Sequence, residues 1–160
     1  MITEKQFSQI VADHKRSIYT VCYLFSKDGY EIDDLFQEIL INIYNGLEHF
    51  NHKSELSTWI WRIALNTCIT AQRKKRRRDS VEMPLSLDIN LLTDDDNDTK
   101  QVRMLKERIS RLGIFDRAII LLWLENLSYD EIGAIVGISV KNVSVILHRI
   151  REELKKMSNL

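Results

Sequence analysis

The sequence predicts an all-α protein made of two small helical domains, and three observations support this. Its 160 residues include only five glycines and one proline, so few positions interrupt a helix. Apolar residues recur at three- and four-residue steps, as on the buried face of a helix. The net charge is +3 over residues 1–78, −6 over 79–100 and +3 over 101–160. We therefore expect two basic domains, 1–78 and 101–160, joined by an acidic linker.

The first predicted helix begins at a capping box formed by Thr3 and Gln6. It is expected to end near Ser26, because the sequence Lys27-Asp28-Gly29 is typical of a turn.

The second helix is predicted to start near Asp33 or Asp34 and to bury an apolar face. Its opposite face is polar and includes Asp34, Gln37, Glu38 and Asn42. Such a face is either simply solvated or a surface on which a partner docks.

The third predicted helix, 57–78, has an apolar first half and ends in six consecutive basic residues, 73–78. Cations suit the negative end of the helix dipole, but six of them repel one another unless a polyanion lies nearby. One interpretation is a solvated basic face before a linker. The other, which we favour, is a contact with the phosphate backbone of a nucleic acid.

Residues 79–100 contain the only proline, Pro84, and a run of aspartates, and they predict an extended or disordered linker. A helix is expected to resume near Thr99, and Asp116 is expected to cap the helix that follows it. The inward residues of the resumed helix are predicted to be Val102, Leu105, Ile109 and Leu112.

A short helix, a glycine turn and a longer helix are predicted near the C-terminus. Ser128 and Glu131 form a capping box, Gly137 supplies a left-handed turn, and Ser139 caps the longer helix. This order is typical of a helix-turn-helix, although any helical hairpin can imitate it. The inward residues of the longer helix are predicted to be Val140, Val143, Leu147, Ile150 and Leu154.

The outer face of that longer helix suits the major groove of DNA. Asn can bind adenine, Lys can reach the acceptors of guanine, and an aliphatic group can contact a thymine methyl. We expect Val145, an apolar residue among polar neighbours, to make that methyl contact. The candidate DNA-binding residues are Lys141, Asn142, Ser144, Val145, His148 and Arg149.

The sequence gives little support for a secreted, membrane-inserted, metal-binding or enzymatic protein. Cys22 and Cys68 lie within helical patterns and are expected to be reduced core residues, as in a cytosolic protein. We expect no signal peptide and no membrane insertion, because no apolar run is long enough. His49 and His52 lack the further ligands of a zinc site, so no metal or cofactor is expected. No catalytic triad or phosphate-binding loop indicates an enzyme.

Four segments together resemble a known family. Residues 34–38, Asp-Leu-Phe-Gln-Glu, resemble the motif D-L-x-Q-E, and 57–66 resemble R-T-W-L-Y-R-I-A-R-N. Residues 127–139 resemble L-S-Y-x-E-I-A-x-x-L-G-I-S, and 147–151 resemble L-H-R-A-R. These motifs, in this order, are those of the extracytoplasmic-function (ECF) sigma factors of the sigma-70 family, the minimal class of bacterial RNA polymerase specificity subunits.

The resemblance implies a cytoplasmic transcription initiation factor without catalytic activity. The first domain would bind the clamp helices of the polymerase large subunit, recognise the minus-ten promoter element and aid its melting; the second would read the minus-thirty-five element and contact the flap. An anti-sigma factor is an expected further partner. The implied polymerase-binding residues are Asp34, Leu35, Gln37, Glu38 and Asn42, and the implied minus-ten and melting residues are Lys53, Ser54, Trp59, Arg62, Asn66, Arg73, Lys74, Arg76 and Arg77.

Two departures from the family pattern leave questions open. Trp59 is followed by Ile60 rather than by a second aromatic residue, so Trp59 is either a core residue or a melting wedge. The common T-V-K-S-R of the recognition helix is Asn-Val-Ser-Val-Ile at 142–146, which implies a promoter sequence of its own. The alternative function is a stand-alone helix-turn-helix regulator, which binds paired half-sites as a dimer.

Overall fold

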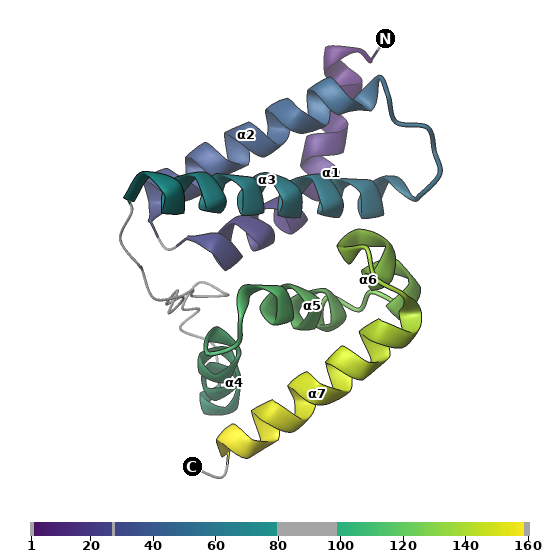
Figure 1. Cartoon of the computed structure of the whole chain (residues 1–160). Helices are drawn as coiled ribbons and strands as arrows, with labels where there is room; N and C mark the ends of the chain where they lie inside the picture. Colours follow the sequence, from purple (N-terminus) through teal and green to yellow (C-terminus); the bar gives the residue numbers. More distant parts are fainter. Residues whose placement is uncertain (1, 27, 80–98, 159–160) are drawn as a thin grey trace. The chain divides into compact units, whose positions relative to one another are not determined.

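The computed structural model describes residues 2–26, 28–79 and 99–158, and within them the chain forms seven α-helices (Figure 1). The all-α prediction is confirmed. The chain divides into two compact units, residues 1–84 and 85–160, and each is described by itself. The predicted linker, 79–100, lies outside the described residues except at its two ends.

The first unit packs α1 (Glu4–Phe25), α2 (Gly29–Leu47) and α3 (Leu56–Asp79) against one another. The predicted capping box is present, with Gln6 N–H donating to Thr3 Oγ1 at 3.1 Å. Ser26 is the C-cap of α1, as expected. The predicted start of α2 near Asp33 or Asp34 is wrong. Asp28 caps a helix that begins at Gly29, and the extra first turn buries Ile32 in the core.

The core of this unit is aliphatic. Its members come from one face of each helix and are at most 1% exposed: Ile18, Val21, Cys22 and Leu24 from α1, Ile39 and Ile43 from α2, and Ile60, Ala64 and Cys68 from α3. Burying each large aliphatic side chain stabilises the fold by about 1.5–3 kcal/mol. This packing fixes the outward faces of α2 and α3, on which several of the predicted functional residues lie.

A glycine lets α2 and α3 approach closely near the loop that joins them. A Cβ atom at Gly46 would lie 2.8 Å from the ring of Trp59, which is closer than packed atoms normally come. Trp59 also packs against Phe50, with ring centroids 5.2 Å apart. The indole is therefore wedged between the end of α2 and the loop.

The two cysteines are buried and free, as predicted for reduced core residues. A hydrogen bond between the thiols of Cys22 and Cys68, together with burial, raises the pKa of Cys68 above its ordinary value. The thiolate, which is the reactive form, is therefore scarce at neutral pH.

We expect a chromogenic disulfide reagent to react slowly with native protein at neutral pH, because both thiols are buried and the pKa of Cys68 is raised. Two equivalents should react rapidly after denaturation in urea. The control is the Cys68→Ser variant, which should release one equivalent when denatured. Immediate reaction of the native protein would contradict this prediction.

The second unit contains α4 (Lys100–Ser110), α5 (Ile114–Leu124), α6 (Tyr129–Val136) and α7 (Val140–Ser158). Thr99 caps α4, as expected, and Ile109 is buried. The prediction that Asp116 caps α5 is wrong, because the N-cap is Gly113 and makes no side-chain hydrogen bond. Two α4 residues predicted to point inward, Val102 and Leu105, are exposed, whereas Leu112 after α4 is buried as predicted.

The helix-turn-helix geometry of α6 and α7 is confirmed. Ser128 and Glu131 form the capping box, and Gly137 adopts the left-handed conformation with φ of 84°. Ser139 Oγ accepts the Asn142 N–H at 3.2 Å, which caps α7. The two helix axes differ by 99° across the turn. Val143, Leu147 and Ile150 are buried as predicted and Leu154 is half-buried, but Val140 at the start of α7 is 44% exposed.

No single helix of the described residues is both long and apolar enough to cross a membrane. Only α6 and α7 taken together, across their 99° bend, have the length and composition of a span.

Candidate nucleic-acid interface

Five of the predicted minus-ten residues form a stripe along α3, which we call the α3 stripe: Trp59, Arg62, Asn66, Arg73 and Arg77. At 100° per residue these positions fall within an arc of about 60°, and they span about 27 Å of the helix axis. Asn66, Arg73 and Arg77 are exposed, whereas Trp59 and Arg62 are half-buried. Lys74 is exposed beside the stripe, and the side chain of Arg76 lies outside the described residues.

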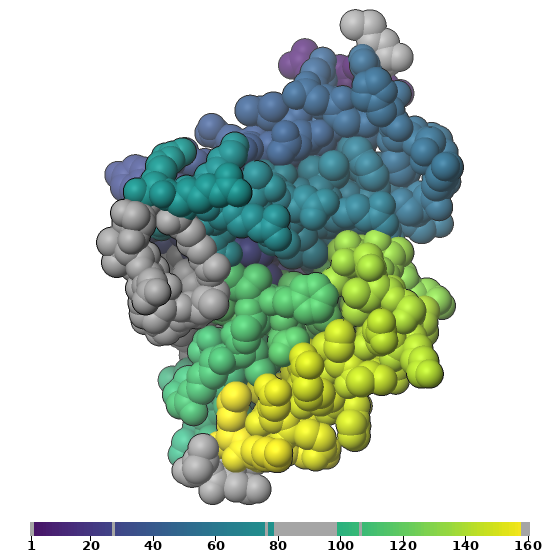
Figure 2. All heavy atoms as spheres, viewed as in Figure 1, coloured from purple at the N-terminus to yellow at the C-terminus, as the bar shows by residue number. Residues whose placement is uncertain are grey.

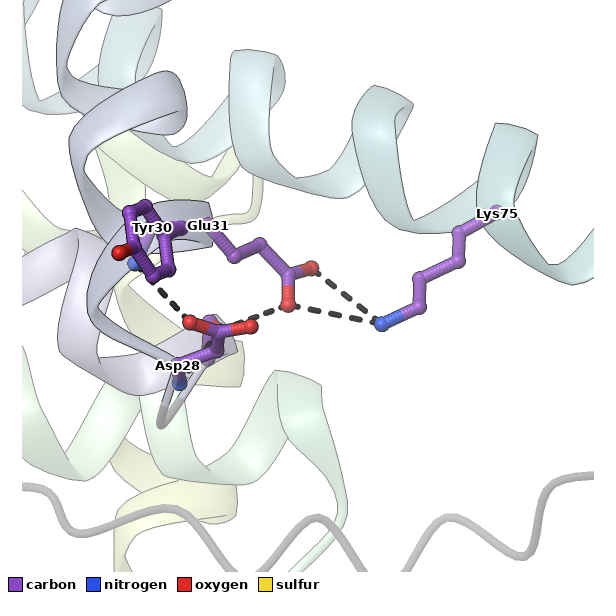
Figure 3. Close-up of polar contacts among 5 residues, drawn as sticks. Asp28, Tyr30, Glu31 and Lys75 are labelled. Atoms are coloured by element: carbon purple, nitrogen blue, oxygen red, sulfur yellow. Dashed lines mark hydrogen bonds and ion pairs between the residues drawn. The ribbon is translucent and has the colours of Figure 1, made fainter.

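The basic side chains at the end of α3 do not all point the same way. Lys75 turns back toward the start of α2, where its Nζ lies 3.5 Å from Glu31 Oε2 (Figure 3). The Ser26 hydroxyl donates to the same carboxylate oxygen at 2.8 Å and accepts the Asp28 N–H at 3.1 Å. One cation of the run is thus used within the domain, while Arg73 and its stripe neighbours face outward.

Two rings in the loop between α2 and α3, those of Phe50 and His52, pack in a row that begins at Trp59 of the α3 stripe. Trp59 packs on Phe50, and the Phe50 and His52 rings lie 4.6 Å apart. His52 adopts a positive φ of 58°, a conformation uncommon outside glycine. Of the predicted residues in this loop, Lys53 is exposed and Ser54 is half-buried. Phe50 was not among the residues predicted for this site. Its position as an aromatic residue in a polar loop before Trp59 was a sequence signal for it.

The structure places the predicted polymerase-binding residues of α2 at different depths. Asp34, Gln37 and Glu38 are exposed. Leu35, which was named with them, is buried at 6% exposure, so its side chain belongs to the core of the first unit and not to this face. Asn42 is half-buried and donates to Thr67 Oγ1 at 2.9 Å, so its amide joins α2 to α3.

Two apolar residues on α2 were missed. Ile41 and Tyr44 are 58% and 53% exposed, and helical spacing places them on the same side as Gln37. An exposed isoleucine and tyrosine among acidic and amide side chains are typical of a protein-docking surface.

All six predicted residues of α7 are exposed: Lys141, Asn142, Ser144, Val145, His148 and Arg149. In Figure 2 the yellow-green surface of α7 is open along its length. Val145 is 60% exposed, so its side chain contributes little to the core.

One of these six residues, the cation Arg149, is partly engaged within the unit. Arg149 Nη2 lies 2.7 Å from Asp116 Oδ1 on α5, and Arg149 Nε lies 3.9 Å from Glu153. Asp116, which does not cap α5, thus ties the start of α5 to the middle of α7. The exposed face of α7 therefore carries short polar and apolar side chains. Besides Arg149, its basic groups are Lys141 and His148.

The described residues contain no group of three or more His, Cys, Asp or Glu side chains arranged to hold a metal ion.

Each of the two units matches the model of a known protein family. Residues 10–78, which cover most of α1 to α3, match the model of Sigma-70 region 2. Residues 103–154, which cover most of α4 to α7, match the model of Sigma-70, region 4.

The chain is also similar along its length to curated proteins. It is 30% identical to the ECF RNA polymerase sigma factor SigW of Bacillus subtilis, over 94% of this chain and 87% of that protein. It is 31% identical to the ECF RNA polymerase sigma-E factor of Haemophilus influenzae, over 95% of this chain and 87% of that protein.

A solved structure has the same fold. The sigma factor RpoE, in complex with the anti-sigma factor NepR from Bartonella quintana, superposes with a TM-score of 0.78 at 20% identity and covers 98% of both chains. The chain thus matches region 2 and then region 4 of the sigma-70 family, and it is similar along its length to ECF sigma factors. This chain belongs to the ECF sigma factors of the sigma-70 family, non-enzymatic subunits that direct RNA polymerase to promoters.

Proposed function

We propose that the two units divide promoter recognition between them while the α2 face holds the chain on core RNA polymerase. The observation that carries this proposal is the presence of two separate outward basic surfaces, the α3 stripe and the outer face of α7. The α3 stripe recognises the minus-ten element and helps to open it. The outer face of α7 reads the minus-thirty-five element from the major groove.

The α2 face is assigned to the clamp helices of the polymerase large subunit. Its acidic and amide groups, Asp34, Gln37 and Glu38, lie one to two turns before the exposed Ile41, and the exposed Asn45 lies one turn after it. This combination of an apolar centre and a polar rim is common in interfaces between proteins. The second unit contacts the flap, and the α3 basic end contacts upstream phosphates.

Regulation by an anti-sigma factor is part of the proposal. The solved sigma factor of similar fold is bound to such a protein, and the α2 face and α7 surface offer it exposed side chains. The proposed location of the chain is the cytoplasm, where polymerase acts.

The deciding experiment is run-off transcription with core polymerase on a library of randomised promoters. The chain should start transcripts from a defined promoter sequence. A gel shift with and without core polymerase tests the stand-alone regulator as the alternative. Specific binding of duplex DNA by the free chain, with no effect on polymerase, would favour the regulator.

Val145 provides a test of base reading by α7. We expect Val145→Ser to weaken binding of the holoenzyme to its selected promoter by about fivefold to tenfold, because a thymine-methyl contact is lost. Affinity for unrelated DNA should stay the same, since the variant changes no charge. The measurement is fluorescence anisotropy on both DNAs, and an equal loss on both would contradict the assignment.

A further inference from the structure

Arg149 is the one arginine among the six predicted DNA-binding residues of α7, and an ion pair ties it to another helix. Its Nη2 lies 2.7 Å from Oδ1 of Asp116, in the first turn of α5, and its Nε lies 3.9 Å from Glu153 Oε1. The side chain of Asp116 is only 18% exposed, whereas that of Arg149 is 54% exposed. The guanidinium is therefore anchored from α5 by a half-buried carboxylate.

The position of Arg149 on α7 would otherwise suit it to read a base. Helical spacing places it one turn after Val145 on the same face, about 6 Å further along the axis. Bidentate binding of arginine to O6 and N7 of guanine is the commonest specific contact in the major groove. It requires two N–H groups of one guanidinium that both face the base. In this chain one carboxylate holds Nη2 and a second lies near Nε.

The strength of the ion pair decides whether Arg149 can turn toward DNA. A hydrogen bond between charged groups and a bidentate arginine–guanine contact are similar in strength, so exchanging one for the other gains little. The exchange also leaves the half-buried carboxylate of Asp116 without its cation and close to the phosphates of DNA, which repel it. Asp116 therefore offsets the energy that Arg149 would gain from guanine.

We propose that Asp116 is a positioning residue that sets the base preference of α7, because its carboxylate keeps Arg149 from binding guanine. The proposal rests on the function proposed above and assigns part of promoter selectivity to a residue outside the recognition helix. The outer face of α7 then selects bases through short side chains, such as Asn142 and Val145, rather than through its arginine.

Asp116→Ala tests this directly, and alanine preserves the helical propensity of α5. The experiment selects binding sites for the holoenzyme from a library randomised over the minus-thirty-five element. We expect guanine to be enriched about fivefold or more over the wild-type selection at one position, because the released guanidinium gains a bidentate contact. That position should lie about two base-pair steps from the one read by Val145, since 6 Å of helix axis spans about two steps of 3.4 Å.

Three further variants separate this effect from a change of charge or of fold. Asp130→Ala removes the same charge from an exposed position of α6 and should leave base preference unchanged. Asp116→Glu keeps a carboxylate at the start of α5 and should retain the wild-type preference. Adding Arg149→Ala to Asp116→Ala should remove the new guanine preference. Circular dichroism should show equal helix content in all variants.

A modified base identifies the contact itself. Replacing the selected guanine by 7-deazaguanine, which lacks the N7 acceptor, should lower the affinity of the Asp116→Ala holoenzyme about fivefold or more and that of wild type much less. Fluorescence anisotropy on the paired duplexes measures both. The inference is overturned if Asp116→Ala selects the wild-type sequence, if its gain in affinity is uniform along the element, or if Asp130→Ala gives the same enrichment. A wild-type chain that starts no transcripts would instead overturn the proposed function together with this inference.

Discussion

Replacing Arg73, Lys74 and Arg77 together by alanine is expected to lower the affinity of the holoenzyme for promoter DNA by about ten- to 100-fold at physiological salt. These three side chains are exposed at the basic end of α3, and each phosphate contact releases a counterion when it forms. The slope of log affinity against log salt should therefore become shallower by about 2.7, since each lost contact removes about 0.9. Anisotropy titrations at several salt concentrations measure this slope.

The matched control removes the same charge from another helix of the same unit. Lys5, Lys15 and Arg16 of α1 are also exposed, and their replacement by alanine should change the slope little. If both triple variants gave the same slope, net charge rather than the position of the basic end would account for binding. Lys75 is left in place in both variants, because it pairs with Glu31.

Replacing Gly137 by valine is expected to destabilise the second unit by about 2–3 kcal/mol and to abolish reading of the minus-thirty-five element. Gly137 has φ of 84°, which a β-branched residue adopts only at high cost. A Cβ atom there would meet nothing within 4 Å. The cost therefore comes from the backbone conformation and not from a steric clash.

A graded series separates these two causes. Asparagine tolerates the left-handed conformation better than alanine, and alanine better than valine, so the loss of unfolding free energy should rise in that order. Urea denaturation followed by circular dichroism measures the series. Equal losses for asparagine and valine would show that strain at the turn is not the cause.

Local features of the fold could be predicted from the sequence because their cause lies within a few residues. The capping boxes at Thr3 and Ser128 and the left-handed turn at Gly137 each depend on side chains three or four positions away, or on a single missing Cβ. The start of α2 was placed too late because Asp33 and Asp34 resemble an acidic first turn, although Asp28 already satisfies the capping requirement.

The features that could not be predicted join residues far apart in the chain. Asp116 has the position and chemistry of a cap, but its carboxylate binds Arg149, which lies 33 residues later. Asn42 has the periodicity of an outer-face residue, yet it donates to Thr67 on α3. No local pattern distinguishes a polar side chain that faces solvent from one that meets a partner across the bundle.

In the candidate site, too, local features could be predicted and features that join distant residues could not. The residues of the α3 stripe were named from the resemblance to the sigma factors, and helical spacing places them on one side of α3. The hollow lined by α1, the end of α2 and the loop before α3 instead requires segments far apart in the sequence to be brought together. Arg117, which is fully buried in α5, likewise has no signal in its neighbours that indicates burial.

Because α3 is a single helix of 24 residues, the packed rings of Trp59 and Phe50 near its first turn and the cations near its last turn are held at a constant separation. The roughly 27 Å between Trp59 and Arg77 corresponds to about eight base-pair steps of duplex at 3.4 Å each. Inserting one residue into the middle of α3 would rotate the basic end by about 100° about the helix axis. The distance between Trp59 and the basic end of α3 is therefore a rigid property of one helix.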